Sequence, residues 1–197
     1  MLFGIFQTCP NQPLIGRLLL QQRFQTMKYR VFGKLNWEFS ALEFETMCLP
    51  TGRNDFANID KHETTRMIRY SIDTGVDYKE TSYGYYRGNS EVVIRRPLID
   101  GYKQKIRIAH RLPCHDVRTT EDFDRCLNVQ LKRLGVKRAD FYLLHHLNKL
   151  VWPKMRDLCI LRWANRAISD CQIGYFGFSL HDDYELAKRR GVTCVLT

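Results

Sequence analysis

Apolar positions along the chain alternate between short β-prone runs and longer segments with helical spacing. The β-prone runs lie at 76–80, 105–111, 139–145 and 173–179. Between them, apolar residues recur at intervals of three and four, as they do on one face of a helix. Strands that alternate with helices are typical of βαβ units, because parallel strands need a crossover connection. The pattern therefore predicts an α/β fold with a parallel sheet.

Local signals predict where the helices begin and end. The predicted helices are 60–74, 119–134 and, more loosely, 155–168. Asp60-x-x-Glu63 and Thr119-x-x-Asp122 have the spacing of capping boxes, in which the two side chains satisfy backbone N–H groups of the first turn. A further helix after residue 89 is expected to be short, because Pro97 has no N–H group and would bend or end it.

The beginning of the chain differs from the rest. Residues 1–26 contain no Asp or Glu and are interrupted by Pro10 and Pro13, so we expect an extension outside the fold, with the domain over 27–197. The opening MLFGIFQ has no positive residue before it and no small-residue cleavage site, which argues against a secretory signal. No apolar run approaches the roughly 18 residues that cross a membrane. We therefore expect no membrane partner.

Composition indicates the cellular compartment and the kinds of partner to expect. The seven cysteines are an odd number without any C-x-x-C pair, which favours reduced thiols in a cytoplasmic protein over a disulfide framework or a zinc site. The net charge is +10, but Lys and Arg are spread along the chain among acidic residues. Nucleic-acid-binding proteins usually cluster them on one face. We expect no nucleic-acid partner, and a basic surface that attracts anionic ligands.

The ends of the predicted strands hold the candidate chemistry. No G-x-G-x-x-G follows a strand, which disfavours a Rossmann dinucleotide site and favours a (β/α) barrel. In such barrels the active site lies at the carboxyl ends of several strands. Those ends carry Glu80 and Tyr85, His110 and Arg111, His145 and His146, and Ser179 and His181. Each residue alone is as readily a surface loop residue, but four successive strands predict one polar rim.

Several segments resemble the aldo/keto reductase family, and in particular its branch of oxidoreductases that often carries a C-terminal iron–sulfur module. The segment MKYRVFGKLNWEFSALEFETMCLP resembles the family's opening, and GVDYKETSYGYYRGNSE resembles its second strand and loop. QLKRLGVKRADFYLLHHLN is similar to its fourth strand, and IGYFGFSLHDDY to its fifth. The resemblance implies a (β/α)8 TIM-barrel type of fold, here incomplete, with about the first five to six βα units.

The resemblance also implies a reaction and a set of residues. The family's catalytic tetrad falls on Glu80, Tyr85, Arg111 and His145. Tyr85 would be the general acid, giving its phenolic proton to a carbonyl substrate as hydride arrives from NADPH. A cation stabilises the phenolate, a carboxylate holds that cation, and the histidine orients the small-molecule carbonyl substrate. The implied cofactor contacts are Glu45, Thr46 and Ser179.

The chain departs from the family pattern at several of these positions. Glu80 stands for Asp and Arg111 for Lys, and an arginine effectively never deprotonates. Glu43 and Glu45 stand for the glycines of the G-x-G-T-M turn, which brings negative charge toward an anionic dinucleotide. Lys79 stands for an aromatic residue, and alternation directs it toward the helix layer, where an unpaired ammonium group is costly.

Two other interpretations remain open. The first is a catalytically inactive, truncated remnant of the family, whose later units and iron–sulfur cluster this chain is expected to lack. Its open sheet edges would then favour self-association. The second is a metal-dependent hydrolase using Glu80, His110, His145 and His146 as ligands. The predicted first strand offers no histidine for such a centre, so no metal site is predicted.

Overall fold

The computed structural model describes residues 2–8, 27–31, 35, 38–52 and 57–180. Its sheet strands are β1 (Leu2–Thr8), β4 (Phe44–Glu45), β5 (Tyr78–Glu80), β6 (Arg107–Leu112), β7 (Ala139–Leu147) and β8 (Ile173–Leu180). A separate hairpin contains β2 (Tyr29–Val31) and β3 (Glu38–Ser40). The helices are α1 (Lys61–Asp73), α2 (Asn89–Ile94), α3 (Glu121–Leu134), α4 (Val151–Asp157) and α5 (Ile160–Ser169). Short 3₁₀ turns are η1 (Tyr85–Gly88), η2 (Arg96–Leu98) and η3 (Lys103–Lys105).

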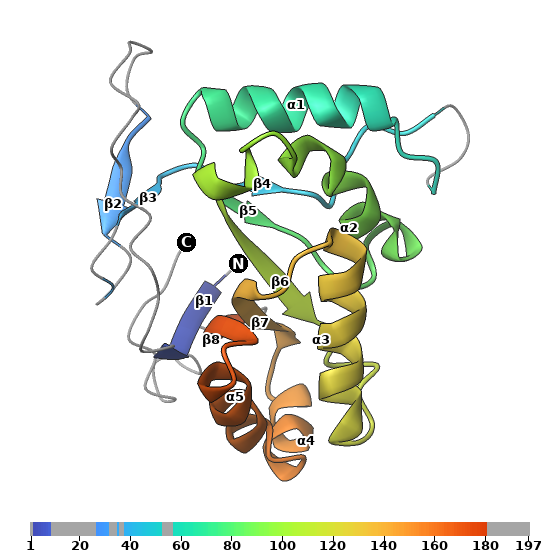
Figure 1. Ribbon diagram of the computed structural model, residues 1–197. Helices are drawn as coiled ribbons and strands as arrows, with labels where there is room; N and C mark the ends of the chain where they lie inside the picture. Colours follow the sequence, from blue (N-terminus) through green and yellow to red (C-terminus); the bar gives the residue numbers. More distant parts are fainter. Residues whose placement is uncertain (1, 9–26, 32–34, 36–37, 53–56, 181–197) are drawn as a thin grey trace.

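The sheet has the strand order β1-β8-β7-β6-β5-β4. Strands β4 to β8 are parallel and follow one another in sequence order, with helices between successive strands from β4 onward. Figure 1 shows the helices on one side of the curved sheet and the β2–β3 hairpin on the other. This arrangement confirms the predicted α/β fold and corresponds to part of a (β/α)8 barrel. Within the described residues the sheet stays open, with β1 and β4 at its edges.

The start of the chain does not lie wholly outside the fold. Leu2–Thr8 form β1, which pairs antiparallel with β8, from Leu2 opposite Leu180 to Thr8 opposite Tyr175. The prediction of an extension over residues 1–26 is therefore wrong for β1, because the edge of β8 offers backbone groups that a second strand can pair with. Residues 9–26 lie outside the described residues.

In each of the two predicted capping boxes, only one of the two side chains accepts backbone hydrogen bonds. Asp60 is the N-cap of α1, and its Oδ1 accepts hydrogen bonds from the backbone N–H groups of His62 (3.0 Å) and Glu63 (2.9 Å). At α3 the acidic residue acts instead, and the Thr119 N–H donates to Oδ2 of Asp122 at 3.0 Å. Each interaction satisfies backbone donors that a first helical turn leaves without partners. The predicted positions of both helices are confirmed.

The predicted third helix is two helices. Helix α4 ends at Asp157 and α5 begins at Ile160, and Cys159 between them has a φ of +56°. A residue in the left-handed region cannot continue a right-handed helix, so the chain turns there. The short helix predicted after residue 89 is confirmed, because α2 ends at Ile94 and Pro97 lies in the following 3₁₀ turn. No described helix has both the length and the apolar character needed to cross a bilayer.

Alternation along the strands divides the sheet into two faces with different contents. One apolar cluster joins hairpin residue Phe39 to Tyr78 (β5), Ala109 (β6), Phe141 (β7) and Tyr175 (β8). Since side chains two apart share a face, these residues define the inner face of the sheet. The opposite, outer face packs against the helices, as Tyr142 and Phe176 do against α5. The inner face is thus apolar where the strands begin, and the hairpin covers it there.

Candidate active site

Three of the predicted rim residues continue the inner face toward the carboxyl ends of the strands. Glu80 lies two residues after Tyr78 on β5, Arg111 two after Ala109 on β6, and His145 four after Phe141 on β7. The period of two that places the aromatic residues on the inner face therefore places these polar residues there as well. The neighbouring strands are in parallel register, with Glu80 opposite Ala109 and Arg111 opposite Leu143.

Arg111 is the centre of the polar cluster at this rim. Its side chain is fully buried, and its Nη1 lies 3.4 Å from Oε2 of Glu80. Its Nη2 atom donates to Oε1 of Glu45 and to the hydroxyl oxygen of Tyr85. A planar guanidinium group presents several donors in fixed directions, which allows one side chain to join three groups.

Tyr85 reaches the cluster from the loop after β5. It begins η1, and its hydroxyl donates to Oε1 of Glu45 at 2.8 Å. Burial raises the pKa of Tyr85 above its ordinary value, and the Arg111 cation acts in the opposite direction. The hydrogen bond to Glu45 and the charges of Glu45 and Glu80 raise the pKa further. In this arrangement the phenol is a weaker acid than a free tyrosine.

Glu80 is a buried carboxyl group with an unusual affinity for its proton. Its side chain is fully buried, with Oε2 3.4 Å from Nη1 of Arg111 and with the Tyr78 hydroxyl as a neighbouring hydrogen-bonding group. Burial raises the pKa of Glu80 to about 8, although the Arg111 cation acts against this rise. Charges on Glu43 and Glu45 raise it further. The ion pair with Arg111 is therefore incomplete at neutral pH.

His145 borders a cavity next to Tyr85. Its Nδ1 lies 3.0 Å from Oγ of Ser82, and its ring stands edge-on to that of Tyr85 with 6.1 Å between centroids. The cavity has a volume of about 270 Å³. It is lined by Ser82, Gly84, Tyr85, Pro113, Cys114, His115, Asp116, His145 and His146. A phenol and an imidazole thus face one space that is large enough for a small organic molecule.

Comparison with known proteins identifies the family. A model described as the aldo/keto reductase family matches residues 46–179. The chain belongs to the aldo/keto reductase family. This is a family of oxidoreductases, and the family named from the sequence motifs is confirmed. The comparison with curated protein sequences finds no match.

Solved aldo/keto reductases have the same fold over much of the chain. The aldo-keto reductase AKR11C1 from Bacillus halodurans, in its holo form, is similar with a TM-score of 0.67 and 20% identity, over 83% of this chain and 53% of that one. The thermostable aldo-keto reductase Tm1743, in complex with the inhibitor epalrestat, is similar with a TM-score of 0.65 and 22% identity. That match covers 83% of this chain and 57% of the other. The chain thus spans somewhat over half the length of these relatives.

The four residues that the resemblance assigns to the catalytic tetrad lie close together, and the side chains of the three implied cofactor contacts bond to other groups of the protein. Glu45 is bonded to Tyr85 and Arg111. Oγ1 of Thr46, a buried residue, accepts a hydrogen bond from Ser90 at 2.9 Å. Ser179 is fully buried, and its Oγ donates to a backbone carbonyl of β7 at 3.3 Å and accepts a backbone N–H of β7 at 3.2 Å. Polar atoms of all three side chains are thus hydrogen-bonded within the protein in this arrangement.

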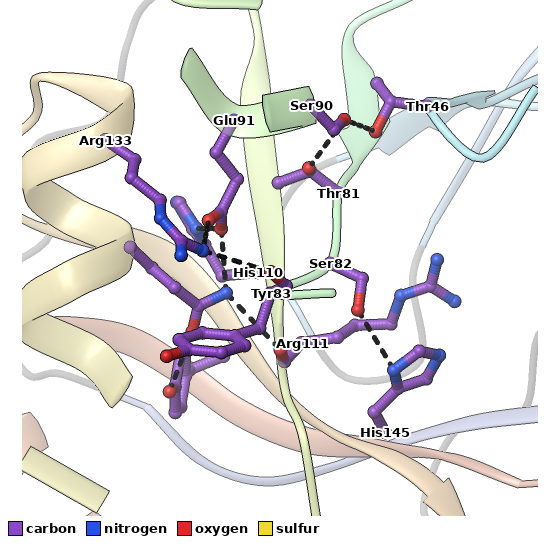
Figure 2. A network of polar contacts seen from close by, with 12 residues as sticks. Thr46, Thr81, Ser82, Tyr83, Ser90, Glu91, His110, Arg111, Arg133 and His145 are labelled. Atoms are coloured by element: carbon purple, nitrogen blue, oxygen red, sulfur yellow. Dashed lines mark hydrogen bonds and ion pairs between the residues drawn. The ribbon is translucent and has the colours of Figure 1, made fainter. Parts of the chain in front are cut away.

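His110 belongs to a different part of this aldo/keto reductase fold. Figure 2 shows His110 and Arg111 extending to opposite sides of β6. Nδ1 of His110 lies 3.4 Å from Oε1 of Glu91, which also accepts from Gln130 at 2.8 Å, while Arg133 bonds the other oxygen of Glu91 at 3.2 Å. The prediction of His110 at the rim is therefore wrong, since adjacent strand residues face opposite sides. The alternation in Arg107–Leu112 could have separated the two.

The hydrogen bonds of Glu91 with His110, Gln130 and Arg133 connect α2 and α3 to β6 on the outer face of the sheet. Burial works against the charged form of Glu91, but hydrogen bonds from His110, Gln130 and Arg133 hold its pKa below the ordinary value. Gly88, which precedes α2, has a φ of +87°, and a Cβ there would lie 2.6 Å from the Arg133 guanidinium. Gly88 thus allows the loop after β5 to approach α3 closely. The sequence analysis did not predict this role for the glycine.

Lys79 has the orientation that strand alternation predicts. Its side chain is 3% exposed, its Nζ donates to Oγ of Ser71 on α1 at 2.5 Å, and it lies 4.3 Å from the centre of the Phe44 ring. Burial lowers the pKa of Lys79 to about 7. The helix layer therefore holds a lysine that readily loses its charge.

The described part of the chain brings no metal ligands together. Among these residues, no group of three or more His, Cys, Asp or Glu side chains is placed to hold a metal ion. His110 lies on the outer face with Glu91, whereas His145 and Glu80 lie on the inner face. His181 lies outside the described residues.

Proposed function

We propose that this chain forms the proton-donating side of an aldo/keto reductase site, in which Tyr85 gives its phenolic proton to the oxygen of a small carbonyl compound. The observation that carries the proposal is the Tyr85 hydroxyl, bonded to a buried guanidinium beside a cavity of about 270 Å³. A carbonyl compound in this cavity would lie next to both Tyr85 and His145, which line it.

Each residue has a separate task in this proposal. Tyr85 moves a proton from its hydroxyl to the carbonyl oxygen, and the Arg111 cation stabilises the phenolate that remains. Glu80 holds the guanidinium from the other side at 3.4 Å. His145, oriented by Ser82 at 3.0 Å, donates a hydrogen bond to the same carbonyl oxygen. In the family, NADPH supplies the hydride; no described side chain of this chain is assigned to its binding.

Binding of carbonyl compounds tests the site without the cofactor. Small aldehydes and ketones are titrated into the folded chain, and the resonances of Tyr85 and His145 are followed by NMR. Tyr85→Phe removes the donor and keeps the ring, so it should weaken binding about fivefold or more, as expected for one hydrogen bond of about 1 kcal/mol. Tyr70→Phe, at an exposed tyrosine on α1, is the matched control. Equal affinity in both variants would contradict the proposal.

A second candidate is an aldo/keto reductase-like protein that binds carbonyl compounds without reducing them. The observation that favours it is the engagement of Glu45, Thr46 and Ser179 within the protein. Product analysis at millimolar NADPH separates the two candidates. Alcohol formation that Tyr85→Phe abolishes supports the reductase, and binding without product supports the second candidate.

A further inference from the structure

Glu45 links the two groups on which the proposed reaction depends. It lies on β4, in register with Glu80 on β5, and its side chain reaches both η1 and β6. A single oxygen, Oε1, accepts the hydrogen of Tyr85 at 2.8 Å and a hydrogen of Arg111. The side chain is 28% exposed, so the contact is close to solvent.

This contact uses the only proton that Tyr85 can donate. A phenol carries one O–H hydrogen, so a hydroxyl that donates to a carboxylate cannot donate to a carbonyl oxygen at the same time. The same carboxylate balances the charge of the guanidinium that would stabilise the phenolate. Glu45 therefore occupies the acceptor position that the proposed substrate needs.

We propose that Glu45 is a built-in ligand of this site, which holds the position of a substrate oxygen at Tyr85 and Arg111 and has to leave before a small carbonyl compound or carboxylate anion binds there. The inference rests on the proposed function for its consequence in catalysis. The contact itself does not, because it concerns only groups of this chain. The vacated position would accept an oxygen atom that carries full or partial negative charge.

The charges around Glu45 favour an anion at that position. Arg111 on β6 is the cation that faces it, Glu80 on β5 lies on the other side of the guanidinium, and Tyr85 stands at η1. Glu43, two residues earlier in the chain, has an exposed side chain, but its charge also acts on Glu45, Arg111 and Glu80. Because burial raises the pKa of Glu80 to about 8, Glu80 does not fully balance Arg111 at neutral pH. Removal of Glu45 would leave a buried cation with an incomplete counter-charge.

The first experiment measures the ionisation of Tyr85. The chain is labelled at the tyrosine Cζ positions with ¹³C, and Tyr85→Phe assigns the resonance. Glu45→Gln keeps the shape and removes the charge, so the pKa of Tyr85 should fall by about 1–3 units, as expected for loss of a neighbouring like charge. Asp170→Asn makes the same charge change at an exposed position at the end of α5, away from the cluster, and should leave the pKa where it is. An unchanged Tyr85 pKa in Glu45→Gln overturns the proposal.

The second experiment fills the vacated position. Glu45→Gly should bind sodium formate, seen as a saturable shift of the Tyr85 resonance, whereas the unmodified chain and Asp170→Asn should show none. An equal response in the unmodified chain overturns the proposal. Should the Glu45 variants not fold, Tyr85→Phe decides, because it removes the hydroxyl that donates to Glu45 and must shift the ¹³C resonance of the Glu45 carboxyl group. If that resonance stays where it is, Glu45 does not hold Tyr85.

The outcomes for Glu45 and for the reaction can be separated. A lowered Tyr85 pKa and formate binding, without product from any carbonyl compound, would support the role of Glu45 and contradict reduction. Product formation that depends on Tyr85, together with a Tyr85 pKa that is the same in Glu45→Gln as in the unmodified chain, would support reduction and contradict the role of Glu45.

Discussion

Nη1 of Arg111 lies 3.4 Å from Oε2 of Glu80, and neither side chain reaches solvent. Burying two charges costs free energy that their attraction only partly returns, and removing one partner leaves the other without compensation. At pH 9, above the pKa of about 8 at which Glu80 ionises, Arg111→Met should therefore lower the free energy of unfolding by about 3–5 kcal/mol, measured by urea denaturation. The loss should be smaller in the double variant with Glu80→Gln, which also removes the carboxylate.

An exposed ion pair provides the control for Arg111. Arg125 on α3 pairs with Asp122 at 2.7 Å, and its side chain is 54% exposed. Arg125→Met should change the free energy of unfolding by no more than about 1 kcal/mol, because solvent screens such pairs. If Arg111→Met costs no more than Arg125→Met, the buried cluster does not stabilise the chain.

Glu80 should make the protein less stable as the pH rises through the neutral range. Burial raises the pKa of Glu80 to about 8, from 4.5 for an ordinary glutamate, so between these pH values the folded state holds a proton that the unfolded state has released. Its contribution to stability is complete below pH 4.5 and is lost as the pH approaches 8. Glu80→Gln should remove this decline in the free energy of unfolding between those pH values, as measured by urea denaturation. Asp170→Asn, at an exposed carboxylate, should keep it.

Lys79 should act in the opposite direction at higher pH. Burial lowers its pKa to about 7 from 10.5, so between these values the unfolded state holds the extra proton and stability rises with pH. Lys79→Met should stabilise the chain at pH 7 and below. It should also remove the rise in the free energy of unfolding above pH 7, as measured by urea denaturation. Lys132→Met, at an exposed position on α3, is the control. An identical pH dependence in both variants would contradict the effect of burial.

The chain should bind NADPH only weakly. The polar groups of Glu45, Thr46 and Ser179 are engaged within the protein, and the Glu45 carboxylate repels an anionic dinucleotide. We expect a dissociation constant above about 1 mM, equivalent to less than about 4 kcal/mol of binding free energy. Titration calorimetry or tryptophan fluorescence measures it. Saturation at micromolar NADPH would show that other parts of the chain hold the cofactor.

Much of the fold could be predicted from local patterns. The four β-prone runs became β5, β6, β7 and β8, and the Asp60 and Thr119 signals placed the starts of two helices. These features depend on residues close together in sequence, whose period and hydrogen-bonding capacity act before any distant contact forms. The division of 155–168 into two helices lacked such a signal, because nothing local marks Cys159 as left-handed.

The sequence by itself determined which residue types stand at the strand ends, and a strict period of two separates His110 from Arg111. Only the tertiary structure decided what those residues touch. Glu45 meets Tyr85 across 40 positions of the chain, and β1 pairs with β8 at the far edge of the sheet. Such contacts depend on strand order, register and side-chain direction together, because a shift of one residue in register moves a side chain to the opposite face.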